Sequence, residues 1–185
     1  DAIFSHWEVP LDLGEAKMLM YHPAFDANHC LYRTVSILNA TGSTPISWPL
    51  FRMLDFYYLF PSQLKAIKPW PREIGKYKSK TANIQDQFED LTNPARTFFD
   101  LQSFQKAATL ELIAKGCLSK SEFDKGIMQL EPDALPPGYI ALLETDEFWR
   151  SDAFIVITKA LPEAPFYGSN GLKTSSGRRE CIHDI

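Results

Sequence analysis

The sequence predicts a mainly α-helical fold with minor β structure: a compact helical domain with a winged-helix-like arrangement. Three stretches, near residues 27–40, 49–60 and 101–115, repeat apolar residues at three- and four-residue spacing. Each begins beside a capping residue and ends at glycine or proline, as helices commonly do. A short β-prone run follows the third stretch, and this order is typical of a winged-helix unit.

The first predicted helix follows an extended approach. Pro23 disfavours the α conformation at His22, and Asp26 is placed to accept backbone N–H groups of the next turn. We therefore expect a helix from about Ala27, ended by Thr41-Gly42-Ser43. Its predicted apolar stripe consists of Cys30, Leu31, Thr34, Val35, Ile37 and Leu38.

The second predicted helix is apolar around most of its circumference. Ser47 or Trp48 occupies its cap position, Pro49 suits its first turn, and Pro61 ends it. Such a helix is buried on more than one side or covered by a partner. Aromatic residues dominate many interfaces, although a place in the core explains these equally well. The candidate partner contacts are Trp48, Phe51, Tyr57, Tyr58 and Trp70.

The third predicted helix is preceded by a shorter one. Asn93-Pro94 indicates the start of a short helix over residues 95–99. Asp100 is placed to cap a longer helix, Leu101 to Lys115, which Gly116 ends. Residues 117–131 are predicted to form the wing. A helix-turn-helix without strands fits this order nearly as well.

The last part of the chain has less regular signals. Residues 139–144 are apolar and fit a helix start or a short strand, and Asp146 is predicted to cap a helix that continues to Leu161. The expected organisation is an N-terminal arm or leader, a single helical, winged-helix-like domain, and a flexible C-terminal tail rich in glycine and serine. Their predicted bounds are residues 1–19, 20–165 and 166–185.

Charge and cysteine content limit the possible partners and compartments. A net charge of −4 creates no global field that would attract nucleic acid or an acidic membrane. Cys30, Cys117 and Cys181 have no repeated spacing, which favours a reduced, cytoplasmic protein over a disulfide framework. No apolar run approaches the roughly 20 residues that span a bilayer, so we expect no membrane contact.

The basic residues concentrate in one stretch, residues 65–80, where Glu73 is the one acid. A solvated loop is one interpretation, and a loop that contacts phosphates or an acidic partner is the other. The possible nucleic-acid contacts are Lys65, Lys68, Arg72, Lys76, Lys78 and Lys80.

A catalytic interpretation would pair Cys30 with His29 or His22 and with Asp26. Adjacent helix residues point about 100° apart, so His29 cannot readily serve as a base for Cys30. Zinc bound by His22, His29, Cys30 and Cys117 would lack any ordinary ligand spacing.

Other catalytic and cofactor motifs are absent from the sequence, which contains no P-loop, no Gly-x-Ser-x-Gly elbow and no His-Glu-x-x-His helix. We therefore expect no catalytic residue, metal or cofactor. Structural roles are expected instead, with Arg33 paired to Asp26 or Asp55.

Two motifs carry a resemblance to a known family. The run His22-Pro23-Ala24-Phe25-Asp26, followed by His29-Cys30 and Arg33, is the first, and the run Leu54 to Pro61 is the second. Together they resemble the middle-component family of ABC-three-component systems, bacterial operons related to the Lamassu anti-phage and anti-plasmid defences. The resemblance spans roughly residues 20–165, so the leader before Met20 and the tail after Gly168 lie outside it.

The resemblance implies a non-enzymatic adaptor subunit that bridges an SMC-like ABC ATPase and an effector subunit, often a nuclease, and meets DNA mainly through the complex. The first alternative is a winged-helix DNA-binding module that uses the helix 101–115 and the wing, with the basic stretch 65–80 on phosphates. The second is a cysteine or metal hydrolase at the first helix.

Overall fold

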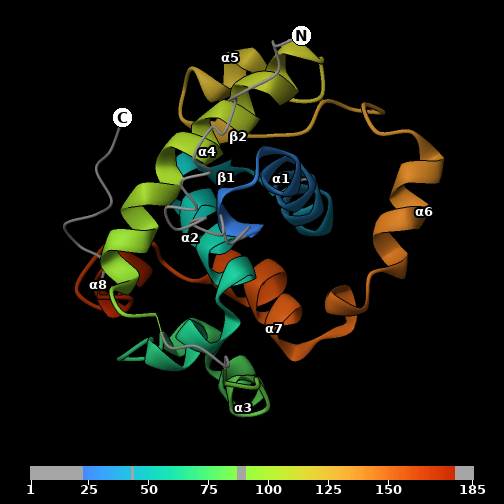
Figure 1. Ribbon diagram of the computed structural model, residues 1–185. Helices are drawn as coiled ribbons and strands as arrows, with labels where there is room; N and C mark the ends of the chain where they lie inside the picture. The colour runs from blue at the N-terminus through green and yellow to red at the C-terminus, as the bar shows by residue number, and fades with distance from the viewer. Residues whose placement is uncertain (1–22, 43, 87–90, 178–185) are drawn as a thin grey trace, which may run out of the picture.

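The computed structural model describes residues 23–42, 44–86 and 91–177, and its fold is mainly α-helical, as predicted. Helix α2 runs through the middle, α1 and α4 pack against it and against each other, and α7 lies beside its C-terminal half (Figure 1). The described α-helices and strands are α1 (Ala27–Thr41), β1 (Ile46–Ser47), α2 (Trp48–Leu59), α3 (Lys78–Ala82), α4 (Pro94–Ala114), α5 (Lys120–Phe123), β2 (Ile127–Met128), α6 (Pro137–Thr145), α7 (Asp152–Ile155) and α8 (Leu172–Ser175).

Shorter helical turns connect these elements. Five are 3-10 turns and one, η5, is π-helical. They are η1 (Pro23–Phe25), η2 (Pro61–Ala66), η3 (Arg72–Tyr77), η4 (Glu147–Arg150), η5 (Val156–Ala160) and η6 (Leu161–Glu163) within the described residues.

Helix α1 begins where the sequence predicts. The Asp26 carboxylate accepts the backbone N–H of His29 at 2.6 Å, which satisfies a donor that the first helical turn leaves unpaired. The helix ends at Gly42, whose φ of 67° is a left-handed value that glycine adopts without strain.

Helix α2 is buried on every side by its own chain. The Ser47 hydroxyl accepts the backbone N–H of Leu50 at 3.4 Å, and Pro49 occupies the first turn. Every residue from Trp48 to Tyr58 is buried, because α1, α4 and η5 surround this helix. Its apolar circumference therefore needs no partner to cover it.

Helix α4 is longer than predicted. The sequence predicts a short helix followed by a second one capped at Asp100, but a single helix runs from Pro94 to Ala114. The Asn93 side chain accepts the backbone N–H of Arg96 at 2.9 Å and so caps the whole helix. Asp100 instead pairs with Arg96 along the helix surface, Nε to Oδ2 3.4 Å.

The stretch 117–131 returns to the start of α2. Met128 and Ile127 pair antiparallel with Ile46 and Ser47, and one further bridge joins Leu118 to Leu130. Each described strand has two residues, and the winged-helix arrangement stays a prediction.

The helix predicted from Asp146 to Leu161 is interrupted. Asp146 accepts the backbone N–H of Phe148 at 2.9 Å, and Ser151 accepts that of Phe154 at 3.1 Å. Ser151 is extended, with ψ of 151°, so each cap begins its own short helix, η4 and then α7.

Residues 166–177 differ from the flexible tail that their composition predicts. Leu172 is fully buried in the core, and the carbonyl of Ser175 accepts the backbone N–H of Lys68 at 2.9 Å. Burial of one leucine and regular turn hydrogen bonds give this stretch a fixed place. Residues 178–185 and the predicted arm, residues 1–19, lie outside the described residues.

Candidate functional site

A buried ion pair joins α1 to α2. Arg33 Nε lies 2.6 Å from Asp55 Oδ1, and neither side chain has any exposed surface. Gln105 of α4 donates to the second carboxylate oxygen of Asp55 at 2.8 Å. Burial lowers the pKa of the Arg33 guanidinium, but the charge and hydrogen bonds of Asp55 outweigh it and leave that pKa raised. This pairing confirms one of the two that the sequence suggests for Arg33.

A second buried arginine extends the network. Arg52 Nε donates to Gln105 Oε1 at 3.2 Å, and its Nη2 donates to the carbonyl of Phe98 at 3.4 Å. The guanidinium also lies over the Phe98 ring, 4.7 Å from its centroid. The network therefore links α1, α2 and α4, and buried charges are stable only when paired in this way.

The residues of the catalytic interpretation serve the fold. Burial, followed by the charge of Asp55, raises the pKa of the Cys30 thiol to about 12, so it is not a thiolate near neutral pH. His29 Nδ1 lies 2.8 Å from Arg33 Nη1 and accepts a hydrogen bond from it, while Asp26 caps α1. Within the described ranges, no three His, Cys, Asp or Glu residues come together to hold a metal ion. His22 lies outside those ranges.

The predicted partner contacts lie mostly inside the molecule. Trp48, Phe51, Tyr57 and Tyr58 expose at most 9% of their surface, and Trp70 is half-buried. A partner cannot reach side chains that α1, α4 and η5 already cover. Of the five residues, Trp70 is the one that stays accessible to a partner.

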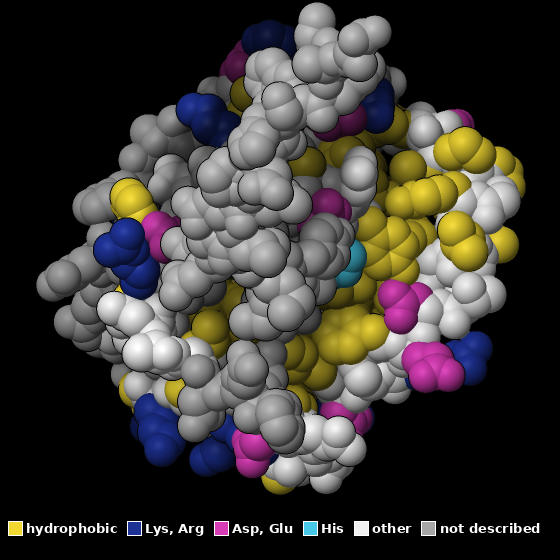
Figure 2. Space-filling view, in the orientation of Figure 1, with side chains coloured by type: hydrophobic (Ala, Val, Ile, Leu, Met, Phe, Trp, Pro, Cys, Tyr) yellow, Lys and Arg dark blue, Asp and Glu magenta, His cyan; other side chains and the backbone are white. Residues whose placement is uncertain are grey.

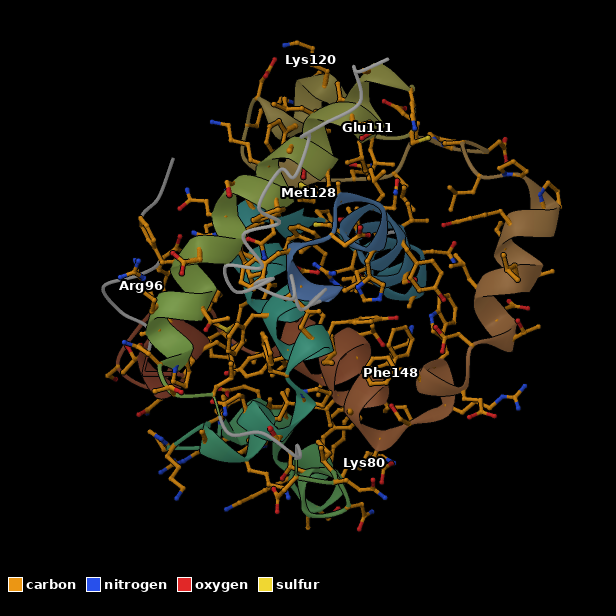
Figure 3. All side chains as sticks on the ribbon, viewed as in Figure 1. Lys80, Arg96, Glu111, Lys120, Met128 and Phe148 are labelled. Carbon is orange, nitrogen blue, oxygen red and sulfur yellow. The ribbon has the colours of Figure 1, made fainter. Side chains whose placement is uncertain are left out.

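The six basic residues of the predicted loop divide into two groups. Lys76 lies 3.6 Å from Glu163, and Lys80 lies 2.7 Å from Asp152, where α3 meets α7 (Figure 3). The side chains of Asn83 and Lys80 lower the pKa of the Asp152 carboxyl.

The other four, Lys65, Lys68, Arg72 and Lys78, line a groove of about 680 Å³. We name it the basic groove. Whether it contacts nucleic acid stays a prediction.

An exposed apolar helix is the surface that the sequence did not single out. Helix α6 stands at the edge of the molecule, away from α1 and α2 (Figure 1), and hydrophobic side chains gather over it (Figure 2). Leu142 is 59% exposed, Ala141 is exposed, and Ile140 lines a groove of about 600 Å³ that reaches Leu38 of α1. The signal in the sequence was the apolar run 139–144, for which a helix start and a short strand were both predicted, and the structure has a helix there.

The fold and these features define a small helical domain whose interior polar groups hold it together and whose surface offers an apolar helix and a basic groove. Residues 19–184 match the family model described as ABC-three component (ABC-3C) system Middle Component 5, and the chain belongs to this family. The match extends the predicted resemblance to residues 166–184. No curated protein and no solved structure matches the chain.

Family membership makes this chain a component of an ABC-three-component system. The chain therefore acts together with other components of that system. None of the helices among the described residues is long and apolar enough to cross a membrane.

Proposed function

We propose that this chain is the adaptor subunit of a prokaryotic anti-phage or anti-plasmid defence complex. It joins an SMC-like ABC ATPase to an effector subunit, often a nuclease, and catalyses no reaction itself. Membership of the middle-component family supports this role. The contacts of the motif residues also support a non-catalytic role. Hydrogen bonds and an ion pair within the fold already involve Asp26, His29, Arg33 and Asp55.

The exposed apolar face of α6 is the observation that carries the proposal. Leu142 and Ala141 face solvent, while Leu143 of the same helix is fully buried. Apolar surface gathered on a projecting helix is typical of a protein contact, because its burial by a partner is favourable. We infer that α6 lies in an interface with one of the other two components.

Two contacts connect the C-terminal end of α6 to α1 and α2, so a partner that moves α6 also acts on these helices. The hydroxyl of Tyr32 in α1 donates to Asp146 at 2.6 Å, directly after α6. The Phe148 ring in the following turn (Figure 3) packs on Tyr58 of α2, with centroids 4.6 Å apart. Displacement of α6 therefore acts on both central helices.

Co-purification of the three components tests the proposal. Leu142→Asp places a charge in the inferred interface, so the variant should lose most of the associated component. Leu110→Asp is the matched control, because Leu110 is 50% exposed on α4 and Leu142 is 59% exposed on α6. The control should co-purify normally. Equal retention of both variants, with both folded by circular dichroism, would contradict the role of α6.

A further inference from the structure

We propose that the basic groove binds an acidic segment of another component of the same system, a short peptide stretch in which Asp or Glu residues flank an apolar side chain. This inference rests on the proposed adaptor function and names the chemistry of one partner surface. It concerns η2, η3 and α3, at the opposite edge of the molecule from α5 (Figure 1).

The charged side chains that line the groove are all basic. Among the described residues, this lining includes Lys65, Lys68, Arg72 and Lys78 and no carboxylate. Lys68, Arg72 and Lys78 are exposed and have no ion pair among the described residues. Lys65 pairs with Asp86, whose side chain is 84% exposed, and so exposed a partner is readily exchanged for another. A carboxylate-bearing ligand is therefore electrostatically complementary to the groove.

The remaining lining of the groove is largely apolar. Leu64 and Ile67 are buried beneath it, and Trp70 lies between Pro69 and Pro71. A groove of about 680 Å³ has the size of a site for several side chains. Charged residues around an apolar lining fit an acidic segment that also carries an apolar anchor.

The groove is held in shape before any ligand arrives. The indole Nε1 of Trp70 donates to the carbonyl of Ile74 at 3.0 Å, which fixes the ring. The backbone N–H of Lys68 donates to Ser175 of α8 at 2.9 Å. A groove that is already ordered loses less conformational entropy when it binds a segment.

The surroundings favour a short acidic peptide over a nucleic acid. The basic residues that continue beyond the groove lie beside carboxylates, Lys76 3.6 Å from Glu163 and Lys80 2.7 Å from Asp152. A long phosphate backbone would meet these carboxylates. A peptide of a few residues meets only the groove.

The test uses the assembled three-component complex and two variants with the same change of net charge. Lys68→Glu with Arg72→Glu reverses two groove cations, and the control, Lys115→Glu with Lys120→Glu, reverses two exposed cations outside the groove lining. The groove variant should bind the partner component about tenfold more weakly, and the control should bind normally. In the unmodified complex, carbodiimide should cross-link Lys68 or Lys78 directly to Asp or Glu of that component.

The outcomes separate this inference from the adaptor function. A complex that forms with equal affinity for both variants, without cross-links from Lys68 or Lys78, overturns the groove and leaves the adaptor role intact. A chain that associates with no component overturns the adaptor role itself. A groove variant that loses binding to a 30-base-pair DNA duplex, but keeps its partner, assigns the groove to nucleic acid and overturns the peptide.

Discussion

Two arginine environments in this molecule differ in where their partners come from. Arg33 and Arg52 are fully enclosed, and each donates to side chains or carbonyls of the same chain. Arg72 is exposed beside a groove whose lining, among the described residues, contains no carboxylate. The interior arginines hold three helices together, whereas the outer one has no ion pair within the part of the chain that the structure describes and is positioned to bind a partner.

The same contrast appears between two ion pairs of equal length. The Arg33–Asp55 and Lys120–Asp124 pairs both have a nitrogen–oxygen distance of 2.6 Å. Both members of the first pair are fully buried, while the side chains of the second are 73% and 60% exposed. Water screens the second pair, so distance alone does not decide how much an ion pair matters.

The largest expected effect follows from removal of the inner carboxylate. Asp55→Ala removes the carboxylate that pairs with the buried charge of Arg33 and accepts from the amide of Gln105, so we expect about 3–5 kcal/mol lower stability. Asp124→Ala should cost about 0.5 kcal/mol or less. Urea denaturation of both variants measures the two losses in the free energy of unfolding. Similar losses would show that the buried network contributes no more to stability than the exposed ion pair.

A double replacement sharpens this comparison. Arg33→Met combined with Asp55→Leu removes both charges together, so it should recover part of the stability that Asp55→Ala loses. Stability as low as that of the single variant would show that the loss does not come from an unpaired charge on Arg33.

A smaller effect is expected at the start of α1. Asp26→Ala removes the acceptor for the backbone N–H of His29 and should lower the free energy of unfolding by about 1 kcal/mol. Asp26→Asn keeps a capping oxygen and should retain most of the stability. Thermal or urea unfolding distinguishes them, and a large loss of partner binding at unchanged stability would instead place Asp26 in an interface.

The smallest effect concerns thiol reactivity rather than stability. The pKa of Cys30 is about 12, so its reactive thiolate becomes abundant only as the pH rises towards that value. At pH 8, iodoacetamide should therefore modify the half-buried Cys117 and leave Cys30 intact until the chain unfolds. Peptide mass spectrometry reads both sites, and equal modification in the folded protein would contradict the burial of Cys30.

The sequence predicts local features of this fold better than its long contacts. The Asp26 cap, the Ser47 cap and the apolar circumference of α2 depend on neighbours in the chain, and all three predictions are confirmed. The sequence did not predict the break at Ser151. The apolar pattern continues across it, so one helix start at Asp146 was predicted where the structure has two, capped by Asp146 and by Ser151.

The surfaces are harder to predict because exposure depends on distant parts of the chain. The α2 aromatics are covered by helices that lie far from them in sequence, so their burial could not be read from spacing alone. For the same reason the run 139–144 was not recognised as exposed. The basic stretch was visible, but only the structure separates Lys76 and Lys80, which have carboxylate partners, from Lys68 and Arg72.

Hydrogen exchange of the free chain and of the assembled complex tests the adaptor role most directly. We expect the backbone amides of α6, residues 138–145, to exchange at least about tenfold more slowly in the complex. Amides of the buried helix α2 should exchange slowly in both states. Unchanged exchange throughout α6, in a complex that contains this chain, would contradict the account.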